Sequence, residues 1–264
     1  MKLCFSTLGC PDWTLEQIAE NGEKTGFQGV ELRTCEDGHV NTGFSKEKRK
    51  QVRALFAAHQ LKIVCISGYT KFCGDDAATL RQNGETLVLN AELARDLGAP
   101  YIRTFPGADA PFSAAGTDAL RYYADKVHAL GVTALMETHD AISTGAGLKK
   151  LLDTVNSPGL AALFDIHHPY RNGEMPEETL SQLGSAIRHV HIKDADTAHK
   201  LCHMGEGDLP VPHMLHLLKQ SGYDGFLSFE WEKMWKPELD GPEIAFPKYI
   251  TYMLGTSMDG TAGR

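Results

Sequence analysis

Eight short apolar runs alternate along the chain with amphipathic stretches that are long enough to form helices. Runs of this length and composition are typical of strands buried on both faces. They are Leu3–Thr7, Gly29–Arg33, Lys62–Ser67, Tyr101–Phe105, Thr133–Glu137, Leu160–Asp165, His189–Lys193 and Phe226–Glu230. Eight successive strand-then-helix units predict an α/β fold, a closed (β/α)8 TIM barrel with helices outside and parallel strands inside.

The length and continuity of the chain agree with this fold. Barrels of this type are commonly about 250 residues long, and the chain has 264. No Pro/Ser-rich linker or block of like charge divides it, so we expect one domain over residues 1–264. The alternative is an open doubly wound sheet. The sequence after the first run, STLGCPDW, lacks the G-x-G-x-x-G phosphate turn of the dinucleotide-binding form of that fold.

Polar residues at the expected helix ends support the same division. Ser45 is expected to cap a helix through His59, Asp76 a long helix through Leu97, and Thr117 a helix through Leu130. Pro212 falls near the start of another helix, where a missing N–H is tolerated. Glycines follow several helix ends, where a left-handed residue is favoured; they are Gly98, Gly131 and Gly222.

Four acidic or imidazole side chains lie at or near the ends of four successive apolar runs: Glu137, Asp165, His191 and Glu230. A buried carboxylate without a partner is costly, and each one taken singly could cap the next helix or pair with a lysine. A shared divalent cation would compensate all four together. Two Glu, one Asp and one His form a mixed oxygen and nitrogen set that suits Mn²⁺, Mg²⁺, Co²⁺ or Zn²⁺. We therefore expect one divalent metal ion.

Strand alternation places these four side chains on the inner face of the predicted barrel. Residues two apart in a strand share a face, and chemistry in such barrels lies at the C-terminal ends of the strands. The partners on the same face are Leu135 for Glu137, Leu163 for Asp165, His189 and Lys193 for His191, and Ser228 and Glu232 for Glu230. The four candidate ligands are thus expected to meet at the barrel mouth.

Composition excludes several classes of protein. The net charge of −8 disfavours a partner held through nucleic-acid phosphates, and the one dense basic stretch, Lys46 to Arg53, is best explained as a solvated helix face. Six cysteines show no CxxC pair, which argues against a disulfide framework. The N-terminal apolar stretch is too short for a signal peptide, and no run approaches a membrane span. We expect a soluble cytoplasmic protein.

The residues resemble the sugar isomerase/epimerase superfamily of xylose-isomerase-like barrels over essentially the whole chain. The motifs that carry the resemblance are Gly29–Arg33, Glu137-Thr-His139, Asp165-Ile-His-His168, His191-Ile-Lys-Asp194, Gly205-Glu-Gly-Asp208 and Gly225–Glu230. The similarity to ketose 3-epimerases implies that Glu137, Asp165, His191 and Glu230 hold the metal. It also implies that His168 binds substrate and that Glu137 and Glu230 act as catalytic acid and base.

The expected substrate is a small sugar, a sugar phosphate or a related hydroxycarbonyl compound. One carboxylate would remove the proton next to the carbonyl to give an enediolate, with the metal as Lewis acid. Return of a proton to the opposite face would epimerise the substrate, and return at the neighbouring carbon would isomerise it. A metal-dependent dehydratase of the same superfamily is an alternative, because it starts with the same proton abstraction. A non-catalytic barrel is disfavoured, since all four ligand-type residues are present.

The superfamily also contains an AP endonuclease branch, a phosphodiesterase that uses several zinc ions. Where that branch carries a histidine before Pro-Gly, this chain has Arg103–Gly107. The third-strand histidine has no match in Cys65–Tyr69, and the Asp-x-His pair falls on His199–Leu201. The additional zinc sites are therefore missing, and no nucleic acid partner is expected.

Other polar residues have weaker signals. Arg33 is expected at the inner end of its strand, where it binds a substrate oxygen or phosphate or pairs with a glutamate. His139 has the parity of Glu137 and is assigned to substrate binding, with a supporting role as the alternative. Lys193 is expected one layer above His191, as a substrate contact or the partner of Asp194. The aromatic residues after the last run, Trp231 and Trp235, would line a substrate lid or a homo-oligomer contact.

Overall fold

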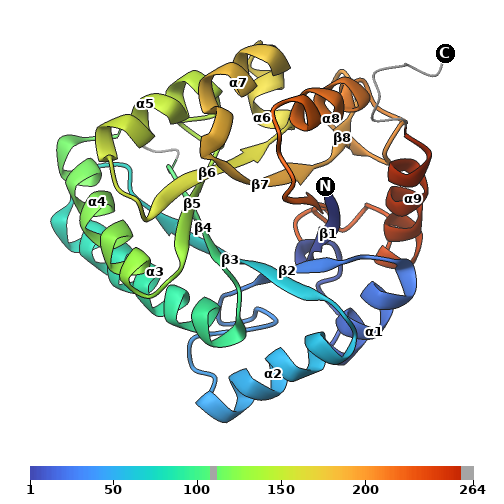
Figure 1. Ribbon diagram of the computed structural model, residues 1–264, viewed down its shortest axis with the longest axis horizontal. Helices are drawn as coiled ribbons and strands as arrows, with labels where there is room; N and C mark the ends of the chain where they lie inside the picture. The colour runs from blue at the N-terminus through green and yellow to red at the C-terminus, as the bar shows by residue number, and fades with distance from the viewer. Residues whose placement is uncertain (108–111, 257–264) are drawn as a thin grey trace.

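The computed structural model describes residues 1–107 and 112–256. Eight parallel strands close into a barrel in the order β1-β10-β7-β6-β5-β4-β3-β2. Figure 1 shows these strands in the centre of the molecule and the helices around them, so the predicted (β/α)8 barrel is confirmed. The barrel strands are β1 (Lys2–Ser6), β2 (Gly29–Arg33), β3 (Lys62–Lys71), β4 (Tyr101–Phe105), β5 (Thr133–Glu137), β6 (Leu160–Asp165), β7 (Ile187–Ile192) and β10 (Phe226–Phe229).

Helices follow the strands and cover the outside of the barrel (Figure 1). The longer ones are α1 (Leu15–Thr25), α2 (Lys46–Ala58), α3 (Ala77–Leu97), α4 (Ala114–Ala129), α5 (Gly145–Val155), α7 (Pro176–Leu183), α8 (Val211–Gln220) and α9 (Pro242–Gly255). Short elements are η1 (Thr7–Gly9), α6 (His167–Arg171), η2 (Gly184–Ala186) and an antiparallel pair after β7, β8 (Asp194–Ala195) with β9 (Leu201–Cys202). Within the described residues, no helix is both long and apolar enough to cross a membrane.

Side-chain caps and a glycine determine where several helices begin or end. The Ser45 side chain accepts a hydrogen bond from the backbone N–H of Lys48, and Asp76 accepts one from Thr79 at 2.8 Å, so both predicted caps are confirmed. Gly98 ends α3 with φ of 80°. The predicted cap at Thr117 is wrong, because the cap is Ser113, four residues earlier, and α4 begins at Ala114.

Four strands differ from the predicted runs, at six boundaries. Strands β1 and β7 each end one residue earlier than predicted, at Ser6 and Ile192. Strands β1 and β7 begin one and two residues earlier, at Lys2 and Ile187, and β10 ends at Phe229, one residue before Glu230. Strand β3 extends to Lys71 because it keeps pairing with β4 beyond an irregularity after Ser67. None of these shifts changes which face of a strand a side chain occupies.

Two layers of apolar side chains position the polar strand ends. The outward residues of the strands, such as Met136 and Phe164, belong to the large core between the barrel and the helices. The inward residues Leu135, Ala161 and Leu163 form a small separate cluster inside the barrel. Glu137 and Asp165 follow this inner cluster on the same face of β5 and β6, so they lie above it at the C-terminal end of the barrel.

Candidate metal centre

Four side chains from four strands meet at the C-terminal end of the barrel. Glu137 and Asp165 end β5 and β6, His191 lies near the end of β7, and Glu230 directly follows β10. The strand register sets Asp165 beside His191, and the Glu230 backbone N–H donates to Ile192 at 3.0 Å. All four residues are buried, and one potential ligand atom from each lies within 4.8 Å of the others. The structure thus brings together the complete predicted ligand set.

The His191 ring has a defined orientation. Its Nδ1 atom lies 3.1 Å from Oε1 of Glu137, 3.2 Å from Oε1 of Glu230 and 4.0 Å from Oδ2 of Asp165. When the ring is neutral and Nε2 carries the proton, the Nδ1 lone pair faces carboxylate oxygens, which is unfavourable. Either a proton on Nδ1 or a cation among these atoms relieves that contact, and the residues therefore fit a cation.

Glu31 lies behind His191, on the side away from the other carboxylates. Its Oε2 atom is 3.0 Å from Nε2 of His191 and 2.8 Å from Nε2 of His189, and the Ser67 hydroxyl donates to its Oε1. Burial acts to raise the pKa of Glu31, but the charge of His191 and the hydrogen bonds of both imidazoles outweigh it and hold that pKa well below its usual value. Glu31 shares the inward face of β2 with Arg33, two residues further along the strand. His189 is buried deeper, as a core histidine with a partner.

Two cationic side chains neutralise part of the cluster. Nη1 of Arg103 lies 3.4 Å from Oε2 of Glu137 and 3.1 Å from Oε1 of Glu230. Sequence reasoning missed this role, although an arginine in the middle of the apolar run Tyr101–Phe105 indicated a buried charge that needs some acidic partner. Nζ of Lys193 lies 2.8 Å from Oδ2 of Asp165 and also contacts Glu230.

The alternative that paired Lys193 with Asp194 is wrong. Asp194 instead accepts hydrogen bonds from the backbone N–H groups of Gly205 at 2.9 Å and Gly207 at 3.1 Å. It therefore holds the Gly205–Asp208 motif in place, while Lys193 points into the cluster and also reaches Glu232 at 3.1 Å.

The charges of the cluster do not balance. Among the described residues, five carboxylates and two permanent cations meet here: Glu31, Glu137, Asp165, Glu230 and Glu232 against Arg103 and Lys193. Burial alone would lower the pKa of His191, but Glu230, Glu31 and Glu137 raise it well above its usual value. Burial would likewise raise the pKa of Glu230, yet His191 and Lys193 hold it well below the normal range. This excess of negative charge suits a divalent cation of the hard or borderline kind.

A cavity of about 300 Å³ opens above the cluster. Glu137 and Glu230 line it, together with Arg103, whereas Asp165 and His191 are not among its lining residues. The two glutamates therefore face the space that a substrate would occupy. The remaining wall is largely aromatic or polar, and its residues include Tyr69, Phe105, His139, Glu232 and Trp235.

Arg33 lies next to this cavity rather than in the cluster. Its Nε donates to the Tyr69 hydroxyl at 3.0 Å, and its guanidinium lies 5.4 Å from the centre of the Trp235 ring. The alternative that paired Arg33 with a glutamate is wrong, since Arg33 forms its ion pair with Asp37 at 3.1 Å. Arg33 thus supports two aromatic side chains that line the cavity.

The two remaining predicted substrate residues lie side by side, and of the two His139 is the one that lines the cavity. The rings of His139 and His168 are 4.4 Å apart, and Nδ1 of His139 lies 2.7 Å from Oδ1 of Asp140. The backbone N–H groups of His167 and His168 donate to Oδ1 of Asp165 at 2.8 and 3.2 Å. Burial lowers the pKa of His168, so its imidazole is held in the neutral form.

The two tryptophans after β10 have different positions. Trp231 is buried and stacks on Phe229 and His203, so it belongs to the core and its predicted place in a lid or an oligomer contact is wrong. Trp235 is 54% exposed and lines the cavity, as predicted for a residue at the mouth.

Comparisons with known proteins agree with this architecture. Residues 19–246 match the family described as xylose isomerase-like TIM barrel. Fructoselysine 3-epimerase of Escherichia coli O157:H7 is 23% identical over 259 residues, which cover 90% of this chain and 93% of the epimerase.

Two solved structures share the fold at 20% identity. The probable 3-DHS dehydratase AsbF of Bacillus anthracis has a TM-score of 0.79 and matches over 97% of this chain and 100% of its own. The IolI protein, whose structure contains a bound zinc atom, has a TM-score of 0.80 and matches over 96% of this chain and 97% of its own. These two likenesses establish the common fold.

Proposed function

The chain belongs to the xylose isomerase-like TIM barrel family, and from this premise we propose that it is a divalent-metal-dependent isomerase or epimerase. Its substrate would be a small sugar, a sugar phosphate or a related hydroxycarbonyl compound. The likeness to fructoselysine 3-epimerase, which extends over 90% of this chain, supports proton transfer next to a carbonyl group.

One observation carries this proposal. Of the four candidate ligands, Glu137 and Glu230 line the cavity at the barrel mouth, while Asp165 and His191 lie beneath them. A simple metal-binding site would not need two carboxylates to face the open space. An enzyme that removes a proton from one face of a carbon atom and returns one to the other face needs two such groups.

Glu137, Asp165, His191 and Glu230 would hold the cation. When bound, the cation supplies Lewis-acid polarisation of the substrate oxygens. Asp165 is fixed for this role, since the N–H groups of His167 and His168 hold its Oδ1 at 2.8 and 3.2 Å.

The two glutamates would move the proton. One begins ionised and takes the proton from the carbon next to the carbonyl, which gives an enediolate; the other begins protonated and delivers its proton to the opposite face. After one turnover the two carboxyl groups have exchanged protonation states, and solvent exchange restores them. Arg103 lies within 3.4 Å of both glutamates and would stabilise whichever of them carries the negative charge. Delivery to the neighbouring carbon would give isomerisation in place of epimerisation.

A dehydratase is a second candidate, favoured by the rim of the cavity. His139 lines the cavity beside His168 and lies 2.7 Å from Asp140. Loss of water needs a base for the proton on carbon and an acid for the leaving hydroxyl, and His139 offers a candidate acid outside the four-residue ligand set. The structural likeness to a probable dehydratase is compatible with this alternative.

The experiment is a screen of ketoses, ketose phosphates and cyclic hydroxyketones in D₂O with Mn²⁺, Mg²⁺, Co²⁺ or Zn²⁺. Products are followed by NMR and mass spectrometry. We expect a product isomeric with the substrate that carries deuterium on the carbon next to the carbonyl. Loss of one water would select the dehydratase. If the product is unlabelled and isotope tracing shows that the migrating hydrogen is carried over intact, the two-carboxylate mechanism is wrong.

A further inference from the structure

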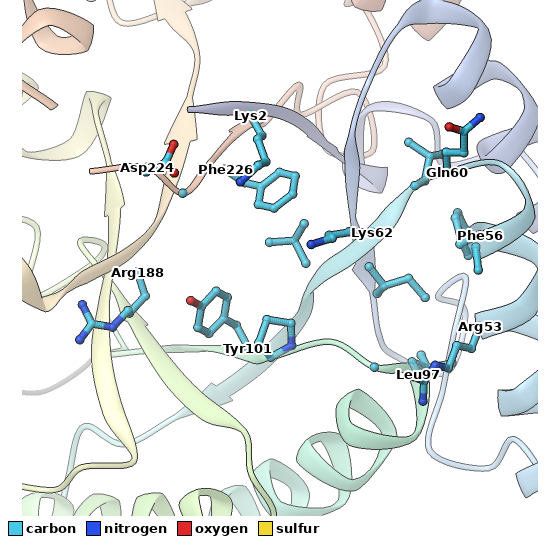
Figure 2. Close-up of a pocket in the computed structure, with 17 residues that line it drawn as sticks. Lys2, Arg53, Phe56, Gln60, Lys62, Leu97, Tyr101, Arg188, Asp224 and Phe226 are labelled. Carbon is cyan, nitrogen blue, oxygen red and sulfur yellow. The ribbon is translucent and has the colours of Figure 1, made fainter. Parts of the chain in front are cut away.

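A second hollow, of about 680 Å³, lies at the N-terminal ends of the strands (Figure 2). Lys2, Lys62, Tyr101 and Phe226 line it, and each is the first residue of its strand. The candidate metal ligands lie at the other ends of parallel strands, about five residues away. At a rise of about 3.3 Å per residue the two sites are separated by roughly 15 Å. The hollow is therefore distinct from the cavity above the carboxylates.

The lining of this hollow has an excess of positive charge. Four cationic side chains contribute to it: Lys2, Arg53, Lys62 and Arg188. In residues 1–107 and 112–256, none of these four forms an ion pair with a carboxylate. Asp224 is the acidic member of the lining, and its Oδ1 lies 3.3 Å from the N-terminal ammonium group. In a chain with a net charge of −8, such a group of cations creates a local field that favours an anion.

Arg188 illustrates why these charges are not neutralised. Its Nη1 donates to the backbone carbonyl of Ile187 at 3.3 Å and also contacts the carbonyl of Ser185. Carbonyl groups satisfy N–H donors but leave the positive charge in place. The field in the hollow thus persists in the folded protein.

The wall of the hollow also has a flat apolar part. Figure 2 shows the Phe226 ring, the Tyr101 ring and the Lys62 side chain around the same opening. The Lys2 ammonium lies 5.7 Å from the centre of the Phe226 ring. Burial raises the pKa of the Tyr101 hydroxyl, so it stays a neutral donor, and the described part of the chain supplies it with no hydrogen-bond partner. Cations, a free donor and two aromatic rings thus face one space.

We propose that this hollow is a binding site for a small organic anion with a flat apolar body, such as an aromatic carboxylate. The carboxylate would lie against the Lys2 and Lys62 ammonium groups, and the ring would cover Phe226 and Tyr101. Ligand sites of this kind combine a mainly apolar wall with a few convergent polar groups, within a volume of about 300 to 1,000 Å³. The proposal is independent of the reaction at the other end of the barrel.

The test measures binding of benzoate to the whole protein by ligand-observed NMR and calorimetry. Benzyl alcohol serves as the uncharged probe and inorganic phosphate as the anion without an apolar body. We expect benzoate to bind equally well to chelator-treated and metal-loaded protein, and more tightly than either other probe. The double variant Lys2→Gln/Lys62→Gln should bind benzoate at least about tenfold more weakly, the scale of a lost charge-assisted contact.

Two further variants make the test specific. Tyr101→Phe keeps the ring and removes the donor, so benzoate binding should weaken by a few-fold even if the double lysine variant folds poorly. Lys48→Gln/Lys50→Gln removes the same charge from the exposed face of α2 and should bind benzoate like the wild type. Any one of four results would overturn the proposal. Two concern the other probes: benzyl alcohol binds as tightly as benzoate, or phosphate does. The other two are an equal loss of benzoate binding in this control variant and benzoate binding that requires the metal.

Discussion

The Nε2 atom of His191 lies 3.0 Å from Oε2 of Glu31, and this contact turns Nδ1 of the same ring toward three other carboxylates. A carboxylate behind a ligating histidine fixes the tautomer and the orientation of the ring. Because both residues are buried, the ring has little freedom to choose another position. Glu31 is thus a positioning residue for the candidate metal centre.

Replacement of Glu31 should weaken metal binding, although all four candidate ligands remain in place. We expect Glu31→Gln to lower the affinity for Mn²⁺ by about 10- to 100-fold, the usual effect of losing such a partner. Calorimetric titration of chelator-treated protein measures this affinity. Glu47→Gln, on the exposed surface of α2, is the control and should bind like the wild type. Equal affinity in the two variants would show that Glu31 does not position His191.

Arg103 should be important for stability before any metal binds. Arg103→Met leaves Glu137 and Glu230 buried without their shared cation, and removal of one partner from a buried ion pair typically costs about 3 to 5 kcal/mol. Urea unfolding in the presence of a chelator measures this loss, and added Mn²⁺ should reduce it. The exposed pair of Lys149 and Asp153 is the control, and Lys149→Met should cost less than about 1 kcal/mol. A loss for Arg103→Met as small as this would contradict the charge balance described above.

The pKa of His191 predicts how pH affects the metal. A raised pKa in the folded state stabilises the metal-free protein fully below about pH 6.5, and this contribution is lost as pH rises through the raised value. Metal binding instead requires the neutral imidazole. The increase in Tm on adding Mn²⁺ should therefore grow as pH rises above about 6.5. Thermal unfolding with and without Mn²⁺ at several pH values measures this trend. An increase in Tm that becomes smaller as pH rises would contradict the prediction.

The two glutamates at the mouth should be needed for turnover. Glu137→Gln and Glu230→Gln should each reduce turnover by at least about 10²- to 10⁴-fold, with lost metal ligation adding to the effect. Circular dichroism should show an intact fold. Glu232 lines the same cavity but is outside the four-residue set, so Glu232→Gln should lose much less activity. Comparable losses of turnover in all three variants would show that turnover depends on the negative charge of the cavity and not on proton transfer by Glu137 and Glu230.

The barrel could be predicted because its signals are local. Apolar runs and their two-residue alternation determine which side chains face inward, and this held for β5, β6, β7 and β10. Boundaries depended on finer contacts. Thr117 resembles a cap, but Ser113 is reached first and Thr117 bonds back to the Ser113 carbonyl inside α4. Strand β3 passes Gly68, a residue that suggests an end, because its pairing with β4 continues.

The site was predictable only in part, because some of its contacts join residues that are far apart in the sequence. Glu137, Asp165, His191 and Glu230 could be found because each one lies at or near the end of a strand-like run. Their partners act across the barrel: Arg103 and Glu230 are 127 residues apart, and Glu31 and His191 are 160 apart. No local pattern reports such a contact, so the positioning role of Glu31 and the bridging role of Arg103 required the structure.

Metal content tests the central claim most directly, and it needs no substrate. Chelator-treated protein is dialysed against Mn²⁺, Mg²⁺, Co²⁺ or Zn²⁺, and the bound metal is measured by mass spectrometry. We expect one ion per chain in the wild type and strongly reduced occupancy in both Asp165→Ala and His191→Ala. The exposed residues Asp153 and His213 supply matched controls, and their alanine variants should keep the ion. Unchanged metal content in both Asp165→Ala and His191→Ala would contradict the assignment of the candidate metal centre.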